Sequence, residues 1–226
     1  MTAPASNPAP NPAPPPAGPP RRFFLAGTDT DLGKTTAAAA ICAAWGHAYW
    51  KPVQAGLDGE TDAQAVARLS GARSFPEAWR LRRPASPHRA AEDEGLRVDP
   101  AGLRLPTDGP LLVEGAGGWD VPLARAPWIM QAALPQTLGL DVILVARTGL
   151  GTLHHSRTAA RAIAADGLRL VGLVLIGPPH PENEADLPAL CEAPVLCRLP
   201  QVADRDADFA ALVAAARAWA PAGARA

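Results

Sequence analysis

The sequence predicts an α/β fold in which a mostly parallel β-sheet carries helices on both faces. Short apolar runs alternate with helix-compatible segments along the chain, and strands separated by helices form βαβ units. One of the runs, residues 141–146 (DVILVA), is apolar almost throughout, as expected for a strand that is buried on both faces of a sheet. A third observation is a glycine-rich loop, placed between the first apolar run and the first helical segment.

The elements follow one another in a regular order. The first strand is the apolar run 22–26, and the alanine-rich segment after the glycine loop is typical of a helix. The expected strands are 22–26, 48–53, 110–114, 141–146, 170–176 and 194–197, and the expected helices are 34–45, 61–70, 127–138, 153–166 and 205–219. Residues 71–109, rich in Arg, Pro and Gly, are expected to form long loops with one short helix, and such loops often build substrate sites.

Composition divides the chain of 226 residues into two parts. Residues 1–20 are nearly all Pro, Ala and Asn, which predicts a disordered or polyproline-type tail, and 21–226 form one domain. The net charge of −1 does not favour nucleic acid or a membrane surface, and no apolar stretch reaches the length of a spanning helix. Three scattered cysteines and the absence of a secretory signal fit a cytoplasmic protein.

The loop Gly27-Thr28-Asp29-Thr30-Asp31-Leu32-Gly33-Lys34-Thr35 has the layout of a phosphate-binding loop. Backbone N–H groups at a helix start attract phosphate oxygens, and glycine allows a close approach. The lysine adds a charge at the outer phosphates and the Thr hydroxyl can bind Mg²⁺. A strict motif requires glycine at position 28, where this chain has Thr28, so the first glycine is one residue early.

Other polar residues stand where strands end or helices begin. Lys51, in the sequence KPVQAG, ends the second strand and should point into the crevice where α/β proteins bind ligands. Glu114 follows the third strand, where a nucleotide-binding fold places a partner of Mg²⁺. By itself, Asp62 is best explained as a helix cap and His88 as an exposed loop histidine. The helix start after Gly151 could bind an anion such as a carboxylate.

Taken together, these motifs resemble the ATP-dependent dethiobiotin synthetases. The five motifs occur in the family's order, over roughly residues 22–202: the glycine loop, Lys51-Pro52-Val53-Gln54, Ser86-Pro87-His88, Glu114-Gly115-Ala116-Gly117-Gly118 and Gly149-Leu150-Gly151-Thr152. The variant glycine loop with Thr28 is the family's own form. The resemblance implies a single-domain P-loop NTPase-like fold and a cytoplasmic homodimer that converts 7,8-diaminononanoate, CO₂ or bicarbonate, and ATP to dethiobiotin, ADP and phosphate.

The resemblance also implies roles for individual residues. Lys51, Lys34 and Thr30 would be catalytic, and Thr35, Asp62 and Glu114 would hold Mg²⁺. The nucleotide would contact Asp31, Leu32, Gly33, Lys34, Thr35, Thr36, Asp62, Glu114, Gly115, Ala116, Gly117, Ile176, Gly177, Pro200, Gln201 and Val202. The substrate would contact Thr30, Asp31, Lys51 and Ala55, with its distal carboxylate at Gly151, Thr152 and His154 of the second subunit.

Three positions depart from the family's pattern. Other members carry a hydroxyl that contacts substrate where this chain has Ala55, and often carry Asn where it has His154. Relatives that select adenine carry Asn-Asp where this chain has Ile176-Gly177. We therefore expect a relaxed base preference, with CTP or GTP also accepted.

Three other interpretations stay open at this point. A regulatory ATPase of the partitioning or division-site type would carry a signature lysine where this chain has Asp29. The nucleotide domain of a cobyrinic or cobyric acid amide synthetase would need an attached glutaminase domain, for which the chain has no room. A degenerate homologue could bind nucleotide without turnover; Ala55 and His154 leave this possible, although Lys34, Thr35, Lys51, Asp62 and Glu114 are present.

Overall fold

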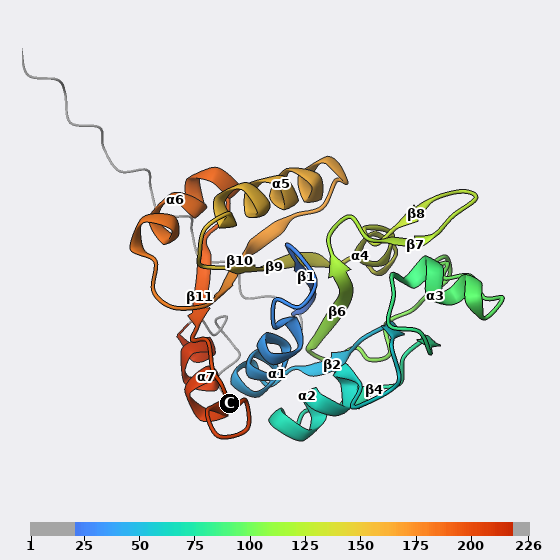
Figure 1. Cartoon of the computed structure of the whole chain (residues 1–226), viewed down its shortest axis with the longest axis horizontal. Coiled ribbons are helices and arrows are strands. Elements are labelled where there is room, and N and C mark those ends of the chain that lie inside the picture. Colours follow the sequence, from blue (N-terminus) through green and yellow to red (C-terminus); the bar gives the residue numbers. More distant parts are fainter. Residues whose placement is uncertain (1–20, 219–226) are drawn as a thin grey trace, which may run out of the picture.

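A seven-stranded parallel sheet forms the centre of the computed structural model, which describes residues 21–218 (Figure 1). The strand order is β11-β10-β9-β1-β6-β2-β4, and every neighbouring pair in this sheet is parallel. The strands are β1 (Arg22–Gly27), β2 (Ala48–Trp50), β4 (Ser74–Phe75), β6 (Leu111–Gly118), β9 (Asp141–Arg147), β10 (Leu170–Ile176) and β11 (Val195–Leu199). The expected fold class is confirmed. The expected tail 1–20 lies outside the described residues.

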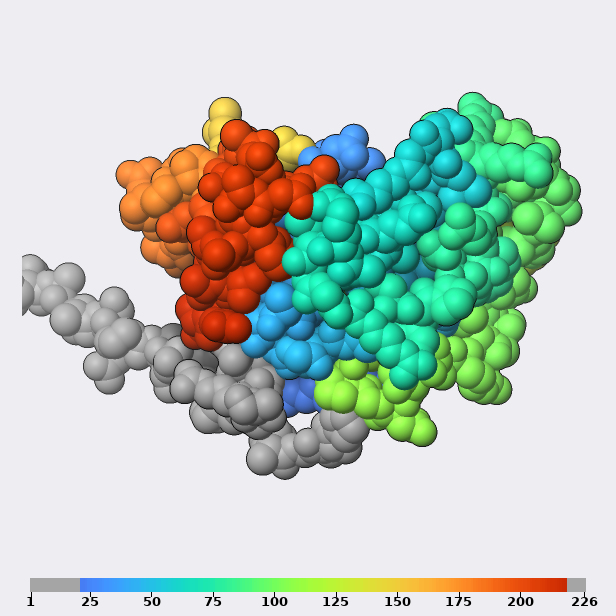
Figure 2. Space-filling model, turned by 90° about the horizontal axis from the view of Figure 1, so that it is seen from below, coloured from blue at the N-terminus to red at the C-terminus, as the bar shows by residue number. Residues whose placement is uncertain are grey.

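Helices cover both faces of the sheet, and each face has its own apolar core. One face packs against α1 (Lys34–Trp45), α2 (Asp62–Ser70) and α7 (Phe209–Arg217). The other packs against α3 (Pro87–Asp93), α4 (Ala133–Leu138), α5 (Thr152–Ala165) and α6 (Pro181–Cys191). Figure 2 views the first face, where the segment that contains α7 (red) adjoins the blue and teal segments of α1 and α2. This is the doubly covered parallel sheet that βαβ units produce.

The second expected strand is interrupted at the point where the site begins. Proline has no N–H to donate to a sheet, so Pro52 separates β2 from β3 (Val53–Ala55). Strand β3 leaves the main sheet and pairs instead with β5 (Trp79–Leu81). Lys51 is therefore left at the carboxyl end of β2, beside the ends of β1 and β6.

The structure differs from the expected elements at two further places. The expected helix 127–138 is helical only in α4, because β8 (Ile129–Met130) pairs with β7 (Pro122–Ala124) as an antiparallel hairpin. Helix α6 was not expected: it begins at Pro181 and contains Pro188, which argues against a helix when only the sequence is considered. Residues 71–109 match the expectation of loops with one short helix, α3, together with β4 and β5.

The three cysteines are free and buried. Burial raises the pKa of the Cys191 thiol to about 11 and that of Cys197 to about 12, so both stay protonated and behave as small apolar side chains. Among the described residues, no helix has both the length and the apolar character needed to cross a bilayer.

Candidate active site

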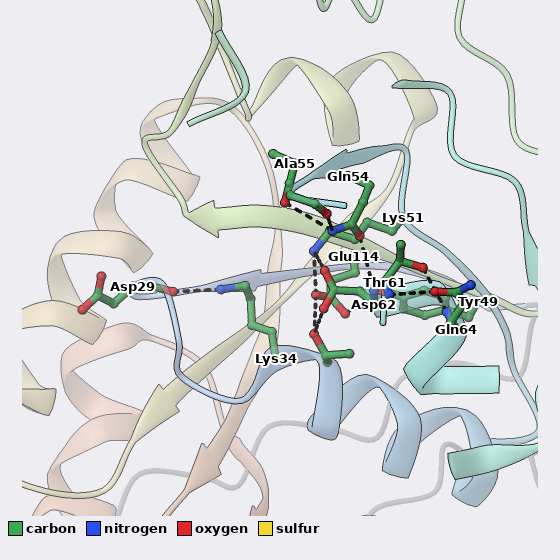
Figure 3. A network of polar contacts seen from close by, with 12 residues as sticks. Asp29, Lys34, Tyr49, Lys51, Gln54, Ala55, Thr61, Asp62, Gln64 and Glu114 are labelled. Carbon is green, nitrogen blue, oxygen red and sulfur yellow. Dashed lines mark hydrogen bonds and ion pairs between the residues drawn. The ribbon is translucent and has the colours of Figure 1, made fainter. Parts of the chain in front are cut away.

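The glycine loop connects β1 to the start of α1. Lys34 is the first residue of α1, and Gly33 before it adopts the left-handed conformation, with φ of 93°. The Lys34 ammonium folds back on its own loop and donates to the Asp29 carbonyl at 2.8 Å (Figure 3). The structure explains why the first glycine of the loop is at position 27. A Cβ on Gly27 would come within 2.9 Å of both Lys34 Cδ and the Asp29 carbonyl oxygen. The loop thus needs glycine at position 27, not at 28.

Four side chains meet at the start of α1, and we refer to Thr35, Lys51, Asp62 and Glu114 as the lysine cluster. Three of its members, Lys51, Asp62 and Glu114, are labelled in Figure 3. The Lys51 ammonium lies between two carboxylates, 2.6 Å from Asp62 Oδ2 and 3.1 Å from Glu114 Oε1. The Thr35 hydroxyl oxygen is 2.5 Å from Asp62 Oδ1 and 3.2 Å from Glu114 Oε1. Lys51 is 6% exposed and Glu114 is 1% exposed, so these charges are largely removed from water.

Strand periodicity explains why two members of this cluster face the same way. Side chains two residues apart lie on one face of a strand. Leu112 of β6 belongs to the core under α1, so Glu114 also faces α1. Tyr49 of β2 belongs to the same core, and Lys51 follows it by two residues. Both side chains are therefore directed to the start of α1.

Asp62 is free to join the cluster because another residue caps its helix. The N-cap of α2 is Thr61, which forms a capping box with Gln64. Asp62 is the first residue of the helix, and its backbone N–H donates to Gln54 Oε1 at 3.3 Å. The interpretation of Asp62 as a cap is wrong, and its role as a metal ligand stays a prediction.

The environment sets the protonation states of these groups. Burial alone would lower the pKa of Lys51, but the charges of Glu114 and Asp62 outweigh it and raise that pKa above its ordinary value. Burial would raise the pKa of Asp62, yet the Lys51 charge and its hydrogen bond keep it below the ordinary value. Burial lowers the pKa of Lys34, partly against the attraction of Glu114. The cluster at neutral pH thus contains a charged Lys51 and a charged Asp62.

The sequence alone did not indicate that Tyr49 and Gln54 belong to the site. Tyr49 is fully buried, and its hydroxyl donates to Glu114 Oε2 at 2.9 Å. Burial, followed by the charge of Glu114, raises the pKa of Tyr49 well above its ordinary value, so the phenol stays protonated. The Gln54 side chain accepts from the Asp62 backbone N–H and so links β3 to the start of α2. The sequence signal for Tyr49 is its position in β2, two residues before Lys51.

The oxygen donors of the cluster suit Mg²⁺. Mg²⁺ commonly takes one or two carboxylates from the protein and completes its coordination with phosphate oxygens and water. Thr35, Asp62 and Glu114 supply a hydroxyl and two carboxylates at one place. In the part of the chain that the structure describes, no group of three or more His, Cys, Asp or Glu side chains could hold a metal by itself. A metal ion held by these three groups would leave its remaining coordination positions to phosphate oxygens and water.

Two cavities open beside the glycine loop. The inner cavity, of about 810 Å³, is lined by Thr30, Asp31, Gly33, Lys34, Thr35, Thr36, Lys51, Ala55, Asp62, Glu114, Ala116 and Gly117, together with Ser86 and Pro87. The outer cavity, of about 450 Å³, is lined by Asp31, Leu32, Gly33, Thr36, Ile176, Gly177, Pro200, Gln201 and Val202. Asp31, Gly33, Thr36 and Arg205 line both, so the two cavities meet over the start of α1.

The outer cavity offers few polar groups on the side of β10. The Ile176 carbonyl accepts from the Thr148 N–H at 3.2 Å, and the Gly177 N–H donates to the Leu199 carbonyl at 3.0 Å. The Gly177 carbonyl accepts from the Arg198 guanidinium at 3.2 Å. A side chain at Gly177 would collide with Thr148 Oγ1, which lies 2.2 Å from the place of a Cβ. The backbone groups of Ile176 and Gly177 are thus engaged within the fold, and this part of the wall has no polar side chain. The rest of the lining includes polar side chains, namely Arg147, Thr148, His180, Gln201 and Arg205.

Four of the expected site residues lie outside these cavities. Gly115 is buried behind the inner cavity, where a Cβ would meet Gln131 and the Phe24 ring at 2.8 Å. Gly151, Thr152 and His154 form the start of α5 and line neither cavity. The Thr152 hydroxyl donates to the Arg147 carbonyl at 2.5 Å, so it is occupied within its own chain.

His88, expected to be exposed, is buried at the start of α3. Its ring Nδ1 lies 3.3 Å from the Pro122 carbonyl oxygen and the ring packs edge-on against Trp128. The motif Ser86-Pro87-His88 thus supports the wall of the inner cavity through packing.

The fold and the cluster define a phosphate-loop nucleotide-binding protein, and comparison with known proteins agrees. Residues 21–208 match the AAA_26 family, described as an AAA domain. A structure of the signal recognition particle receptor FtsY from Elizabethkingia anophelis in complex with GDP has the same overall fold, with a TM-score of 0.50, 11% identity and coverage of 88% of this chain and 65% of that chain. At that identity the likeness concerns the fold alone.

Closer relatives identify the particular family. The chain is 47% identical over 188 residues to the ATP-dependent dethiobiotin synthetase BioD of Rhodopseudomonas palustris strain HaA2, covering 81% of this chain and 87% of the relative. It is 45% identical over 188 residues to the BioD protein of Agrobacterium fabrum strain C58, covering 80% and 88%. The chain belongs to the ATP-dependent dethiobiotin synthetase family, which confirms the resemblance and decides against a partitioning or division-site ATPase.

Proposed function

We propose that this protein is a dethiobiotin synthase, a ligase that forms the ureido ring of dethiobiotin from 7,8-diaminononanoate, CO₂ and ATP in biotin biosynthesis. The observation that carries the proposal is the position of Lys51. It is a buried, charged lysine at the end of β2 that lines the same cavity as the phosphate-loop lysine, Lys34. A protein that only bound nucleotide would not need a second buried cation facing the space beyond the phosphates.

The chemistry requires three bond-forming steps. One amine of the substrate captures CO₂ as a carbamate. A carbamate oxygen then attacks the γ-phosphorus, which releases ADP and leaves a carbamic–phosphoric anhydride. The second amine attacks the carbonyl carbon, closes the ring and expels phosphate. The first step creates a negative carbamate, the second brings it against the negative triphosphate, and the third expels phosphate, so the protein's task is to hold these groups in line and to neutralise their charge.

The residues of the inner cavity match this task. The N–H groups at the start of α1 and the Lys34 ammonium would hold the phosphates, which requires Lys34 to leave the Asp29 carbonyl. Thr35, Asp62 and Glu114 would hold Mg²⁺, which neutralises phosphate charge when bound. With the carboxylates engaged in this way, the Lys51 ammonium would face the carbamate and the transferred phosphoryl group, where an oriented cation stabilises developing charge. Thr30 and Asp31 would face the diamine.

The nucleotide would extend from the inner cavity to the outer one. The base would lie against Ile176, Gly177 and the segment 200–202, where Ile176 and Gly177 have no side-chain donor or acceptor and Gln201 has an amide. A site that forms no side-chain hydrogen bonds to the base cannot reject another base strongly. We therefore expect ATP to be used, with CTP and GTP as further substrates.

We further propose a homodimer with the substrate between subunits. The start of α5 lies away from the inner cavity of its own chain, and Leu150 beside it is fully exposed. In a dimer, the N–H groups after Gly151 would donate hydrogen bonds to the distal carboxylate of the substrate bound to the other subunit. The Thr152 side chain is engaged elsewhere, so it would contribute through its backbone, with His154 nearby.

The test is a phosphate-release assay in which 7,8-diaminononanoate, bicarbonate, Mg²⁺ and ATP are each omitted in turn, with dethiobiotin detected by mass spectrometry. We expect phosphate release that requires the diamine and is accompanied by dethiobiotin. ATP hydrolysis that does not require the diamine would overturn the proposal. Nucleotide binding without any turnover would indicate a degenerate relative, and Ala55 and His154 would then be the positions to examine first.

A further inference from the structure

Tyr49 connects the buried core to the lysine cluster. Its ring packs in the apolar layer under α1, with Ile41 and Val66, and is completely shielded from water. Its hydroxyl is at the top of that layer and donates to Glu114 Oε2 at 2.9 Å (Figure 3). The two strands are neighbours in register, with Tyr49 opposite Leu112, so Glu114 is one step further along the same face.

The hydroxyl of Tyr49 serves Glu114 alone among the polar contacts found in the described residues. A phenol buried without a partner is costly, and a phenylalanine would fill the same apolar space without that cost. The neighbouring Trp50 gives a useful contrast. It points to the opposite face of β2, where its indole N–H donates to the Pro76 carbonyl at 2.8 Å, far from any candidate ligand.

Three groups donate hydrogen bonds to the Glu114 carboxylate, two to Oε1 and one to Oε2. Oε1 is approached by the Lys51 ammonium at 3.1 Å and by the Thr35 hydroxyl at 3.2 Å, both of which line the inner cavity. Oε2 is approached by Tyr49 from the core side. A carboxylate can rotate about its last bond, and the Tyr49 contact is the one that holds Oε2 back and keeps Oε1 toward the cavity.

We propose that Tyr49 is a positioning residue that orients Glu114 for Mg²⁺, an inference that rests on the Mg²⁺–nucleotide site of the proposed function. Groups that hydrogen-bond to a metal ligand fix its orientation, and their removal typically weakens metal affinity. Tyr49 itself lines neither the inner nor the outer cavity. It acts through Glu114.

The removal of the hydroxyl should affect one step of ligand binding and leave another intact. In Tyr49→Phe, Oε2 of Glu114 is left buried without its donor, and the carboxylate is no longer held with Oε1 toward the cavity. The affinity for Mg²⁺ in the presence of ADP should fall by about tenfold. ADP binding in excess EDTA depends on the glycine loop and the outer cavity, and it should be unchanged.

The measurement is calorimetric titration of ADP with and without Mg²⁺, on the full-length protein. Trp50→Phe is the matched control, because it also removes one buried aromatic donor from β2, but on the opposite face. We expect Trp50→Phe to keep the normal effect of Mg²⁺ on ADP affinity. Equal behaviour of the two variants, or an unchanged Mg²⁺ affinity in Tyr49→Phe, would overturn the proposal.

A double variant shows whether Tyr49 acts through Glu114. Glu114→Gln should weaken Mg²⁺ binding by itself, and adding Tyr49→Phe to it should cause little further loss, because the oriented group is already gone. Independent, additive losses would contradict the proposed route. None of these titrations measures substrate turnover. A result that contradicts the role of Tyr49 can therefore be distinguished from a failure of the protein to form dethiobiotin.

A spectroscopic measurement leaves Tyr49 itself in place. Tyr49 is the only tyrosine of the chain, so growth with 3-fluorotyrosine places a single fluorine label on this ring. We expect one ¹⁹F resonance that shifts when Mg²⁺ is added to the ADP complex, and that fails to shift in Glu114→Gln. A resonance that does not respond to Mg²⁺ in the unsubstituted protein would overturn the proposal.

Discussion

Replacing Lys51 by methionine should destabilise the protein that has no ligand. The substitution keeps an unbranched chain but leaves Asp62 and Glu114 facing each other without the ammonium that lies 2.6 Å and 3.1 Å from them. Breaking a buried ion pair costs about 3–5 kcal/mol, and the lower end applies because Asp62 is partly exposed to water. For a domain of this size each kcal/mol corresponds to about 2–4 °C, so a cost of about 3 kcal/mol should lower Tm by about 6–12 °C.

Calorimetric melting without metal or nucleotide measures this effect, and Arg68→Met is the matched control. Arg68 also bridges two carboxylates, those of Glu60 and Asp206, but on the surface, where ion pairs contribute little. We expect a much smaller fall in Tm for that variant. Mg²⁺ and ADP should restore part of the loss in Lys51→Met, because a cation again lies near the two acids. Equal losses in both variants would refute the buried-charge reasoning.

Three further predictions follow from the same geometry. Gly27→Ala should weaken ADP binding by about tenfold or more, since an added methyl would overpack the loop at a cost of about 1–3 kcal/mol. CTP and GTP should support dethiobiotin formation at rates within about 100-fold of ATP, because no polar side chain from Ile176 or Gly177 reads the base. The stability that Lys51 contributes should depend on pH at both extremes. The pKa of Asp62 lies below its ordinary 3.8, so the stability that the charged Asp62 contributes is lost as pH falls below that value. The pKa of Lys51 lies above 10.5, so the stability that the charged Lys51 contributes is lost as pH rises beyond that value.

Each of these predictions has its own check. The ADP affinity of Gly27→Ala is measured by calorimetric titration, with Gly59→Ala as the control. Gly59→Ala should bind ADP with normal affinity, since a Cβ at Gly59 meets nothing within 4 Å. For the bases, a rate comparison at saturating nucleotide that showed a strong preference for ATP alone would contradict the inference drawn from Ile176 and Gly177. For pH, the difference in Tm between the unsubstituted protein and Lys51→Met should be constant near neutrality and narrow at both ends; a difference that changed around neutral pH would indicate that another group is responsible.

The sequence was most informative where one local rule dominates. The glycine loop predicted the junction of β1 and α1, and alternation along β2 and β6 explains why Lys51 and Glu114, placed at strand ends, meet at one edge of the sheet. The residue types at positions 34, 35, 51 and 114 already indicated a phosphate and metal site. Asp62 required the resemblance, because a helix start explains an aspartate equally well when only its neighbours in the chain are known.

What the sequence did not predict depends on contacts between distant segments. The hairpin of β7 and β8 replaced the start of an expected helix through cross-strand pairing. Helix α6 forms although it contains Pro188, and no local pattern favours that. The contact between Tyr49 and Glu114 joins residues that are 65 positions apart, and it becomes visible only when β2 and β6 are placed side by side.

The most direct test of the central claim follows the atoms of bicarbonate. The protein is supplied with ATP, Mg²⁺, 7,8-diaminononanoate and freshly dissolved bicarbonate that carries ¹³C and ¹⁸O, and both products are analysed by mass spectrometry after a short reaction. We predict ¹³C in the ureido carbon of dethiobiotin and ¹⁸O in the released phosphate, because the carbamate oxygen that attacks the γ-phosphorus leaves with it. Unlabelled phosphate, formed without labelled dethiobiotin, would contradict carbamate phosphorylation at this site.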